Sequence, residues 1–281
     1  MNKSKSTDAE TSAAYLGPQG TFSNEAAKRC FPPEVKLIPC DTIEGIFEAT
    51  ESGTACYGIV PVENSAQGCV SVTLDRCVKT SLTVCGETTM PIRNALMSKA
   101  SDLSSIQRIY SHPQPLLQCR AWLLANLPGV TQEALSSTAE SAIRAAEDPT
   151  AAAIGSAMLA ELYCLNLLVE DIHDREHNVT RFWVLGHQDS EPTKCDKTSL
   201  WFITPHKPGA LYRVLKVFAD TSVNIMRIES RPYPGKAWEY VFFLDLEGHR
   251  QNANLQKAFS LLPACVEAYR VLGSYPAFQS E

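Results

Sequence analysis

The feature that most restricts the fold of this 281-residue chain is an alternation of short apolar runs with amphipathic helical patterns, between about residues 13 and 186. Such an alternation is typical of an α/β layer with mostly parallel strands. Strands are predicted at Ala14–Gly17, Val35–Pro39, Gly58–Val62, Leu82–Glu87, Ile106–Tyr110, Val130–Leu135, Ala152–Ile154, Leu165–Asp171 and Thr180–Gly186. Helices are predicted at Phe22–Cys30, Ile43–Glu51, Pro115–Asn126 and Thr138–Ala146. Because nine strands are many for one sheet, we expect two lobes with a cleft between them, joined by crossing segments near Thr89–Ile92 and Ile172–Thr180.

The pattern changes after a polar stretch, Gln188–Asp196, which has the composition of a linker. The elements predicted beyond it, in order, are strand Thr198–Thr204, helix Gly209–Asp220, strands Val223–Arg231 and Trp238–Leu246, helix Asn252–Leu262 and strand Val266–Leu272. The order βαββαβ is the ferredoxin-like arrangement. The sequence therefore predicts two domains, residues 13–190 and 197–275.

The charge and composition of the chain exclude several classes of function. Twenty-five Lys and Arg against 31 Asp and Glu give a net charge of −6, with no basic block to bind nucleic acid or an anionic membrane. No uncharged run is long enough to span a bilayer, and Met1–Ala14 lacks the apolar core of a signal peptide. The ten cysteines never form Cys-x-x-Cys, so they are interpreted as buried thiols in a reducing compartment. We expect a cytoplasmic protein.

Three polar clusters each follow a predicted strand at the point where a helix should begin. They are Gly17-Pro-Gln-Gly-Thr-Phe-Ser23, Pro61-Val-Glu-Asn-Ser65 and Ser111-His-Pro-Gln114. The carboxyl ends of strands face the ligand crevice of an α/β sheet, and helix N-termini offer unpaired N–H groups to anions. A small anionic ligand fits this arrangement, although ordinary N-capping is the more frequent explanation of any single cluster.

A fourth cluster, Asn178-Val-Thr-Arg-Phe182, opens the last predicted strand of the α/β region. Thr180 offers a hydroxyl, and the planar guanidinium of Arg181 can bind a carboxylate through two hydrogen bonds. Just before it, His173-Asp-Arg-Glu-His177 has the H-x-x-E-H spacing of inverted zinc proteases. That motif needs a helix, whereas this stretch connects two predicted strands, so no metal site is predicted. Cys119 lies in an apolar helical pattern and is interpreted as a structural thiol.

In the C-terminal part, Lys207-Pro-Gly-Ala-Leu211 forms a turn that opens the first helix, and Glu229-Ser-Arg-Pro232 closes the second strand. Gly209 at a helix start allows close approach by a ligand carboxylate. An amino acid would satisfy such a site, and a plain turn with a surface charge pair explains the spacing equally well.

Together these motifs resemble the prephenate dehydratase family, over nearly the whole span from Tyr15 to Tyr275. The resemblance rests on Gly17–Ser23, on Gly58-Ile-Val-Pro-Val-Glu-Asn-Ser65 with Gly68, on Ser111-His-Pro-Gln-Pro-Leu-Leu-Gln-Cys119 and on Asn178–Phe182. The C-terminal part is similar to the family's ACT-type regulatory domain, through Gly209-Ala-Leu211, Glu229–Pro232 and Tyr240-Val-Phe-Phe-Leu-Asp245 followed by Gly248-His249.

The resemblance implies an enzyme that converts prephenate to phenylpyruvate, water and carbon dioxide in L-phenylalanine biosynthesis, without a metal or cofactor. It implies a catalytic region of two lobes, like that of periplasmic binding proteins, with the active site between them. By this resemblance Thr180 is the donor to the departing hydroxyl and Arg181 recognises a carboxylate, while the substrate is positioned by Glu63, Asn64, Ser111 and Gln118. Further substrate contacts are expected from Thr21, Ser23, Ser65, His112, Gln114 and Phe182.

The resemblance also implies feedback regulation by phenylalanine, bound where two subunits pair. The expected contacts are Gly209, Ala210, Leu211, Asn224, Glu229, Ser230 and Arg231. Such regulation requires at least two states of an oligomer, here a homodimer or homotetramer. With no N-terminal helical domain of the kind fused in chorismate mutase relatives, a monofunctional enzyme is expected.

Two other activities remain open at this point. Arogenate dehydratase shares the fold and motifs, and acts on a substrate that carries an amino group in place of the keto oxygen. A catalytically silent amino-acid sensor would bind its ligand in the lobes without turnover. The combination of Thr180–Phe182 with Glu63–Ser65 argues against the sensor, because a binding protein needs no proton donor beside its ligand.

Overall fold

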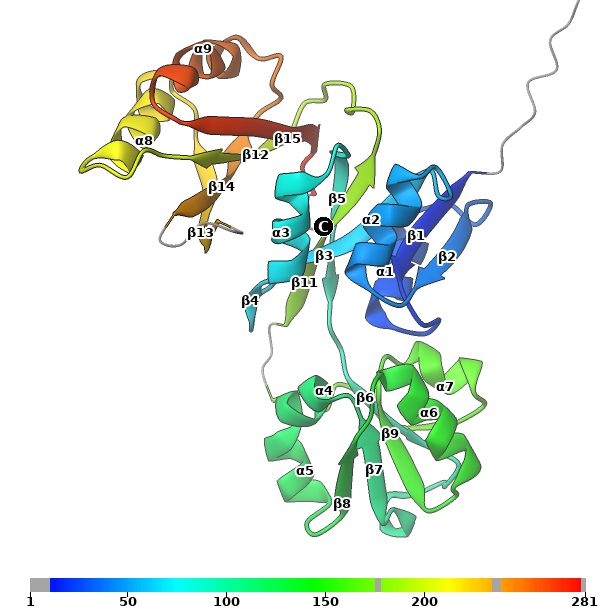
Figure 1. Ribbon diagram of the computed structural model, residues 1–281. Coiled ribbons are helices and arrows are strands. Elements are labelled where there is room, and N and C mark those ends of the chain that lie inside the picture. Colours follow the sequence, from blue (N-terminus) through cyan, green and yellow to red (C-terminus); the bar gives the residue numbers. More distant parts are fainter. Residues whose placement is uncertain (1–10, 175–177, 234–238, 279–281) are drawn as a thin grey trace, which may run out of the picture. The chain divides into compact units, whose positions relative to one another are not determined.

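The computed structural model describes residues 11–174, 178–233 and 239–278, which form two compact units (Figure 1). The first unit consists of the described residues within Met1–Ile46, Ile59–Val70 and Thr89–Phe182. The second consists of those within Phe47–Gly58, Ser71–Thr88 and Trp183–Glu281. The chain therefore passes from one unit to the other several times.

One mixed α/β sheet has the strand order β2-β1-β3-β11-β5, with β4 paired to β3. Its strands are β1 (Ser12–Leu16), β2 (Lys36–Cys40), β3 (Tyr57–Asn64), β4 (Gly68–Cys69), β5 (Thr83–Pro91) and β11 (Val179–Gly186). The associated helices are α1 (Phe22–Cys30), α2 (Ile43–Glu51) and α3 (Ser71–Lys79). In the first unit, Tyr15, Ile59 and Phe182 are buried in one cluster with Ala26 and Ala27 of α1. This cluster fixes α1 against the sheet.

The second sheet has the order β10-β6-β9-β7-β8 and lies within the first unit. Its strands are β6 (Ala95–Ser98), β7 (Arg108–Ser111), β8 (Thr131–Ala134), β9 (Ala151–Gly155) and β10 (Asn166–Val169). β7 is parallel to β8 and β9, whereas β6 is antiparallel to both β9 and β10. The expectation of mostly parallel strands is wrong for this sheet, because β6 pairs antiparallel with both of its neighbours and only two of the four strand pairings are parallel.

Helices cover both faces of the second sheet (Figure 1). They are the 3₁₀ turn η1 (Leu103–Ser105) and helices α4 (Pro113–Gln118), α5 (Arg120–Asn126), α6 (Thr138–Glu147) and α7 (Met158–Leu162). The single helix predicted over Pro115–Asn126 is divided at Cys119, whose backbone leaves the helical region at φ −110° and ψ 12°. Asp174 stabilises the new helix start, since its carboxylate accepts from the Ala121 and Trp122 N–H groups over 2.9 and 3.0 Å.

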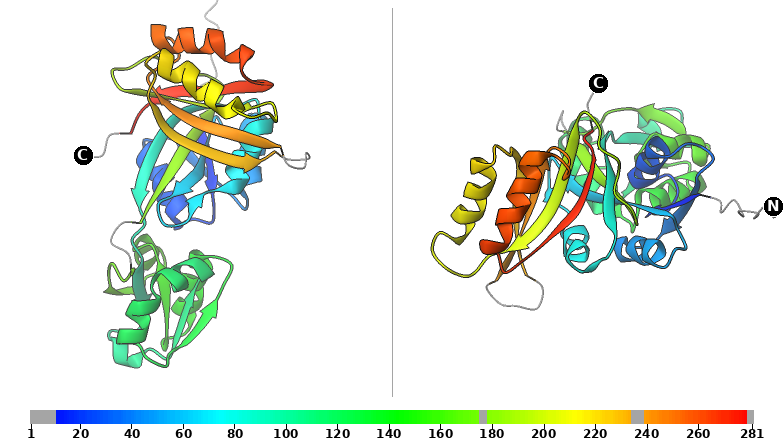
Figure 2. Two further views of the ribbon diagram at one scale, coloured as in Figure 1. Left: turned by 90° about the vertical axis from the view of Figure 1, so that its left-hand side faces the viewer. Right: turned by 90° about the horizontal axis from the view of Figure 1, so that it is seen from above.

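The C-terminal elements confirm the predicted ferredoxin-like βαββαβ order. They are β12 (Asp196–Ile203), α8 (Ala210–Asp220), β13 (Ile225–Pro232), β14 (Tyr240–Glu247), α9 (Ala253–Leu261), the 3₁₀ turn η2 (Leu262–Ala264) and β15 (Ala268–Pro276). The sheet is antiparallel in the order β13-β14-β12-β15. Both helices lie on the same face (Figure 2), where Val214 and Phe218 of α8 pack with Leu255 of α9 in the buried core. Trp238, the expected first residue of the third strand in this part of the chain, lies outside the described residues.

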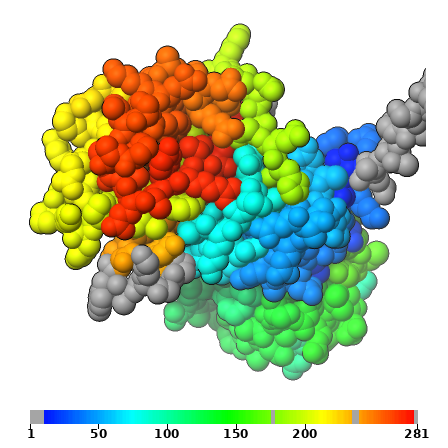
Figure 3. Space-filling view, turned by 45° about the horizontal axis from the view of Figure 1, so that its top comes forward, coloured from blue at the N-terminus to red at the C-terminus, as the bar shows by residue number. Residues whose placement is uncertain are grey.

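Within the second unit, β15 lies directly against β5 and the end of α3 (Figure 3). A Cβ atom placed on Gly273 would lie 2.0 Å from the Val84 carbonyl oxygen, so only glycine permits this approach. The Arg270 guanidinium donates to the carbonyls of Thr80 and Leu82, the latter over 2.6 Å. The C-terminal sheet is thus anchored on the α/β layer. Among the described residues, no helix is long and apolar enough to cross a membrane.

Candidate active site

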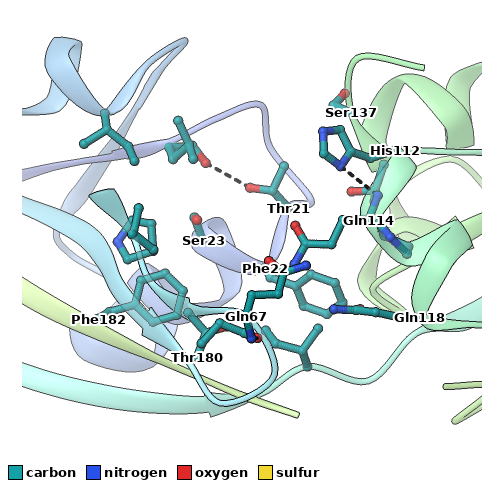
Figure 4. Close-up of a pocket in the computed structure, with 18 of the residues that line it drawn as sticks. Thr21, Phe22, Ser23, Gln67, His112, Gln114, Gln118, Ser137, Thr180 and Phe182 are labelled. Atoms are coloured by element: carbon teal, nitrogen blue, oxygen red, sulfur yellow. Dashed lines mark hydrogen bonds between the residues drawn. The ribbon is translucent and has the colours of Figure 1, made fainter. Parts of the chain in front are cut away.

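A cavity of about 530 Å³ lies in the first unit, and residues from both sheets line it (Figure 4). The lining begins with the loop after β1 and the start of α1, continues through β3, β4 and the turn between them, and includes the starts of α4 and α6 and one face of β11. Its polar members are Thr21, Ser23, Asn64, Gln67, His112, Gln114, Gln118, Ser136, Ser137, Thr138 and Thr180, and its apolar members include Phe22, Val70, Ile92 and Phe182. The predicted clusters at strand ends therefore do meet.

The starts of α1 and α6 both contribute to this cavity. Thr21 caps α1 by accepting a hydrogen bond from the Asn24 N–H, and Ser137 caps α6 by accepting from the Glu140 N–H. Helix N-termini carry partial positive charge and spare N–H groups, so they favour an anion. Among the described residues that line the cavity there is no Lys or Arg. These residues can attract an anion through backbone dipoles, polar side chains and His112.

The loop that leads into α1 depends on one glycine. Gly20 has a φ of +87°, in the left-handed region, and a Cβ atom there would lie 2.4 Å from Leu159 Cδ2. Its N–H donates to Asn24 Oδ1, and the Thr21 hydroxyl donates toward the carbonyls of Leu16 and Pro18, each at 3.0 Å. The Thr21 hydroxyl therefore stabilises the loop. Ser23 lies near it among the residues that line the cavity.

A hydrogen-bond network centred on Asn64 fixes the hydroxyl of Thr180. Asn64 Oδ1 accepts from the N–H groups of Ala66 and Gln67, which assigns Nδ2 to the other side of the amide. Nδ2 donates to Asn178 Oδ1 over 2.8 Å and to Thr180 Oγ1 over 2.9 Å. Thr180 is only 8% exposed, and its own hydroxyl hydrogen has no acceptor among the described residues. That hydrogen is available to a ligand in the cavity.

The alternation of side chains along β11 separates the two residues expected to act together. Thr180 and Phe182 point to the same face and line the cavity, whereas Arg181 between them lies on the other face and is not in the lining. Glu63, paired with Cys69 in the short β3–β4 ladder, is not in the lining either. The structure therefore does not bring Arg181 or Glu63 to the cavity.

Ser111 and Ser65 also lie outside the cavity lining, where their hydroxyls hold the backbone. The fully buried Ser111 hydroxyl donates to the Ile154 carbonyl over 2.7 Å and so ties β7 to β9. Ser65 Oγ accepts from the Val179 N–H over 3.0 Å, which fixes the residue before Thr180. Of the other expected contacts, His112, Gln114, Gln118 and Phe182 do line the cavity.

Sequence reasoning missed the segment before α6 and the turn after Asn64. Ser136, Ser137 and Thr138 enter the lining, as does Gln67. Ser137 followed by Glu140 is the capping-box spacing, in front of a helix that was predicted, so this signal was present. Gln67 had no such signal, because the fold alone brings the turn to the cavity.

The expected regulatory residues lie around the start of α8 and along β13. Gly209 precedes α8 with a φ of +74°, and Ala210 and Leu211 open the helix. Asn224 Nδ2 donates to Glu247 Oε2 over 3.0 Å, and Glu229 lies 3.7 Å from the Arg227 guanidinium. Ser230 is exposed on the edge strand β13.

Arg231 is bound to helix α3 of the same unit. Its Nε and Nη2 donate to the two carboxylate oxygens of Asp75 over 3.1 and 3.3 Å, and its Nη1 donates to Ser71 Oγ over 2.7 Å. A bidentate Arg–carboxylate pair of this kind is geometrically specific. Ser71 is the first residue of α3 and follows Val70, which lines the cavity.

The described residues contain no group of three side chains that could hold a metal ion. Residues 175–177, which complete the His173–His177 spacing, lie outside them. All ten cysteines are free thiols. Burial raises the pKa of the Cys119 thiol to about 12, with Asp174 adding to the effect, so this cysteine is a poor nucleophile.

Comparison with known proteins identifies two family models in this chain. The model described as prephenate dehydratase matches residues 13–190, and that of the ACT domain matches residues 202–260. The bifunctional chorismate mutase/prephenate dehydratase of Aquifex aeolicus (strain VF5) is 42% identical over 271 residues, which cover 96% of this chain and 75% of the relative. The corresponding protein of Stutzerimonas stutzeri is 41% identical over 264 residues, covering 94% and 72%.

Solved structures share the whole fold. The prephenate dehydratase of Arthrobacter aurescens, in complex with L-Phe, superposes with a TM-score of 0.86 at 37% identity, covering 95% of this chain and 90% of that one. GqqA, described as a novel type of quorum quenching acylase, also gives a TM-score of 0.86, at 28% identity, with 95% and 98% covered.

Proposed function

The chain belongs to the prephenate dehydratase family, and we propose that it converts prephenate to phenylpyruvate in the 530 Å³ cavity of its first unit, with Thr180 as the hydrogen-bond donor to the departing hydroxyl. The observation that supports this assignment is the direction of the hydrogen bond between Asn64 and Thr180. Because Asn64 can only donate to Thr180 Oγ1, the threonine hydrogen is directed to the cavity.

The reaction needs one proton and no redox change. The bond between the ring and its carboxylate breaks, and carbon dioxide leaves. The electron pair of that bond enters the ring, which becomes aromatic, while the bond from the opposite ring carbon to the hydroxyl oxygen breaks. The oxygen takes up a proton and leaves as water. Thr180 stabilises this developing negative oxygen through a hydrogen bond that Asn64 strengthens by donating to the same hydroxyl.

Recognition of the two substrate carboxylates falls to the starts of α1 and α6 and to donors such as Gln118, since the described part of the lining has no Lys or Arg. Phe22, Ile92 and Phe182 provide an apolar wall for the ring. A carboxylate held against such a wall loses hydration, which favours its departure as carbon dioxide. Arg181 and Glu63 then have no direct contact with the substrate, because they are not among the residues that line the cavity. Ser111 contributes by fixing β7 to β9.

We assign catalysis to residues 13–190 and regulation to residues 197–275, with L-phenylalanine as the effector around Gly209–Leu211, Asn224 and Glu229–Arg231. Support comes from the ACT match and from the L-Phe complex of the Arthrobacter relative. Arg231 offers a route for the effect, because it joins the effector segment to the helix that follows Val70 of the cavity.

We further propose that the protein acts as a homodimer or homotetramer in the cytoplasm. Met226 and Ile228, which are 52% and 45% exposed on the edge strand β13, provide an apolar surface that a second copy would bury. Ten free thiols suit a reducing compartment.

The acylase activity named for GqqA is less well supported by this site. A hydroxyl nucleophile needs a base to take its proton. The Thr180 hydroxyl instead accepts from an amide, and no described His, Asp or Glu is bonded to it.

The deciding experiment is a side-by-side assay of purified protein with prephenate and with arogenate, each with and without L-phenylalanine. Phenylpyruvate formation from prephenate, reduced by L-phenylalanine, is the expected result. Preference for arogenate would move the chain to the sister activity, and no turnover of either would favour the silent sensor.

A further inference from the structure

Two buried amide side chains in the first unit share one hydrogen bond, and each leaves one polar atom without a partner. Asn94, fully buried between β5 and β6, donates from Nδ2 to Gln118 Oε1 over 3.1 Å. Asn94 Oδ1 and Gln118 Nε2 are both buried and form no hydrogen bond within the described chain. A buried polar atom without a hydrogen-bond partner destabilises a fold and is rare in native proteins, so this arrangement calls for a functional explanation.

The unpartnered nitrogen belongs to a side chain of the cavity. Gln118 lines the 530 Å³ cavity and also a neighbouring one of about 320 Å³, and is thus placed where the two adjoin. Figure 4 shows its side chain extending from the end of α4 toward the middle of the site. The cavity is thus lined by a side chain whose amide nitrogen no described residue satisfies.

The direction of the Gln118 amide depends on Asn94. The terminal torsion of glutamine is broad and roughly two-fold, so the amide could present either its nitrogen or its oxygen to a ligand. Asn94 removes this choice by binding the oxygen. Both backbones are anchored on one segment, because the Asn94 carbonyl accepts from the Ile172 N–H over 2.9 Å and the Gln118 carbonyl from the Asp174 N–H over 2.7 Å.

The buried Cys119 thiol lies beside the same amide. Burial raises the pKa of this thiol to about 12, Asp174 contributes in the same direction, and a hydrogen bond from Asn94 acts against both. Asn94 therefore lies next to both Gln118 and Cys119.

We propose that Asn94 is a positioning residue that holds the Gln118 carboxamide with its N–H group directed at an oxygen atom of the anionic substrate. This inference rests on the proposed function. A dicarboxylate needs donors in a cavity whose described lining residues include no Lys or Arg, and an amide oxygen turned to it would repel it. Asn94 is not among the residues that line the cavity, so it acts through Gln118.

The test is a double-mutant cycle between positions 94 and 118. Asn94→Asp keeps the shape, but its carboxylate can only accept, so it binds Gln118 Nε2 and turns Oε1 to the substrate. We expect kcat/KM for prephenate to fall about 10- to 100-fold, the value of a hydrogen bond to a charged group. Asn94→Ser, which removes the amide without adding a charge, should give a smaller loss in the same direction and serves if the Asp variant does not fold.

In a Gln118→Ala background, the same Asn94 substitutions should change kcat/KM less than about 3-fold, because the group that they misdirect is gone. Asn166→Asp is the matched control, since Asn166 of β10 donates to the carbonyls of Lys99 and Ala100, is not among the residues that line the cavity, and its replacement should leave kcat/KM unchanged. Losses that multiply across positions 94 and 118 in an active enzyme would refute the positioning role alone. A wild-type protein that does not turn over prephenate would refute the proposed function as well.

Discussion

Asn64 and Thr180, 116 residues apart, are joined by a hydrogen bond of 2.9 Å in which the asparagine amide is the donor. Both amide hydrogens and both acceptor positions of Asn64 are occupied, by Thr180, Asn178 and the N–H groups of Ala66 and Gln67. A fully occupied amide cannot rotate without breaking several bonds. The direction of the Thr180 hydroxyl is thus set before substrate arrives, which is preorganisation of a donor for the transition state.

Replacing Thr180 with alanine should lower kcat about 10²- to 10⁴-fold, the usual range for loss of a proton-donating group, with little change in KM. Thr180→Ser, which retains the hydroxyl, is the matched variant and should keep most of the activity. Phenylpyruvate formation followed by absorbance measures both. Equal rates in the wild type and Thr180→Ala would exclude the assigned role.

Asn64→Asp should damage the same step by reversing the hydrogen bond. A carboxylate at this position accepts only, so the Thr180 hydroxyl turns to donate to it and no longer points at the substrate. We expect a loss of kcat close to that of Thr180→Ala, and a double variant no worse than either single one. Activity of Asn64→Asp relative to wild type should recover as the pH falls and the new carboxyl is protonated. A pH-independent ratio of the two rates would argue against this reversal.

Asp75→Asn should weaken regulation without affecting basal turnover, because the Asp75 carboxylate accepts two of the hydrogen bonds that Arg231 donates to α3. Couplings between sites are typically worth a factor of about 5 to 150, so the L-phenylalanine concentration for half-inhibition should rise by at least 5-fold. Lys216→Ala is the control, since it removes an exposed ion pair with Asp220 that lies within α8 of the same domain. Calorimetry should show that L-phenylalanine still binds Asp75→Asn. An unchanged inhibition curve would exclude Arg231 as the link.

The buried thiols should make the fold sensitive to alkali. Burial raises the pKa of Cys77 and of Cys119 from the ordinary 9.0 to about 12. An unfolded thiol ionises near pH 9, so each contribution is complete below that pH and is lost as the pH rises toward 12. Over that window each thiol should steepen the fall in unfolding free energy by about 1.4 kcal/mol per pH unit.

Urea unfolding at several pH values from 8 to about 11 tests this prediction. Cys119→Ala and Cys77→Ala should each flatten the pH dependence relative to wild type, whereas Cys195→Ala, at an exposed position, should not. The same slope in all four proteins would show that these thiols are not the cause.

The order of elements was largely predictable because several helices have an apolar face at spacings of three and four, and many strands are short runs that are buried throughout, as in β9, or alternate, as in β13. Helix α3, Ser71–Lys79, was missed since only Thr73, Leu74 and Cys77 of it are buried, which is a weak apolar face. Strand β6 was missed because it is short and ends in a buried polar residue, Ser98, whose hydroxyl is satisfied by the Ala151 carbonyl. The local sequence pattern does not reveal that a residue far away in the chain accepts this hydrogen bond.

Part of the site could have been predicted more accurately from the amino-acid sequence. Thr180 and Arg181 are neighbours on a strand, so the alternation of side chains already requires them to face opposite sides. By contrast, the roles of Asn64 and Asn94 depend on hydrogen bonds to residues far away in the sequence, at Thr180 and Gln118. The motifs indicate the region of the site, whereas only the folded structure shows which atoms face the cavity.

The close passage of Gly273 over the Val84 carbonyl has a consequence for protein engineering. A regulatory domain transplanted from another enzyme onto this catalytic region must bring a glycine at the equivalent point of its last strand, since any side chain there would push the strand away from β5. The transplant would also have to supply a cation like Arg270 to satisfy the carbonyls of Thr80 and Leu82. Chimeras that preserve these two positions have a defined contact surface at which the two parts can be exchanged.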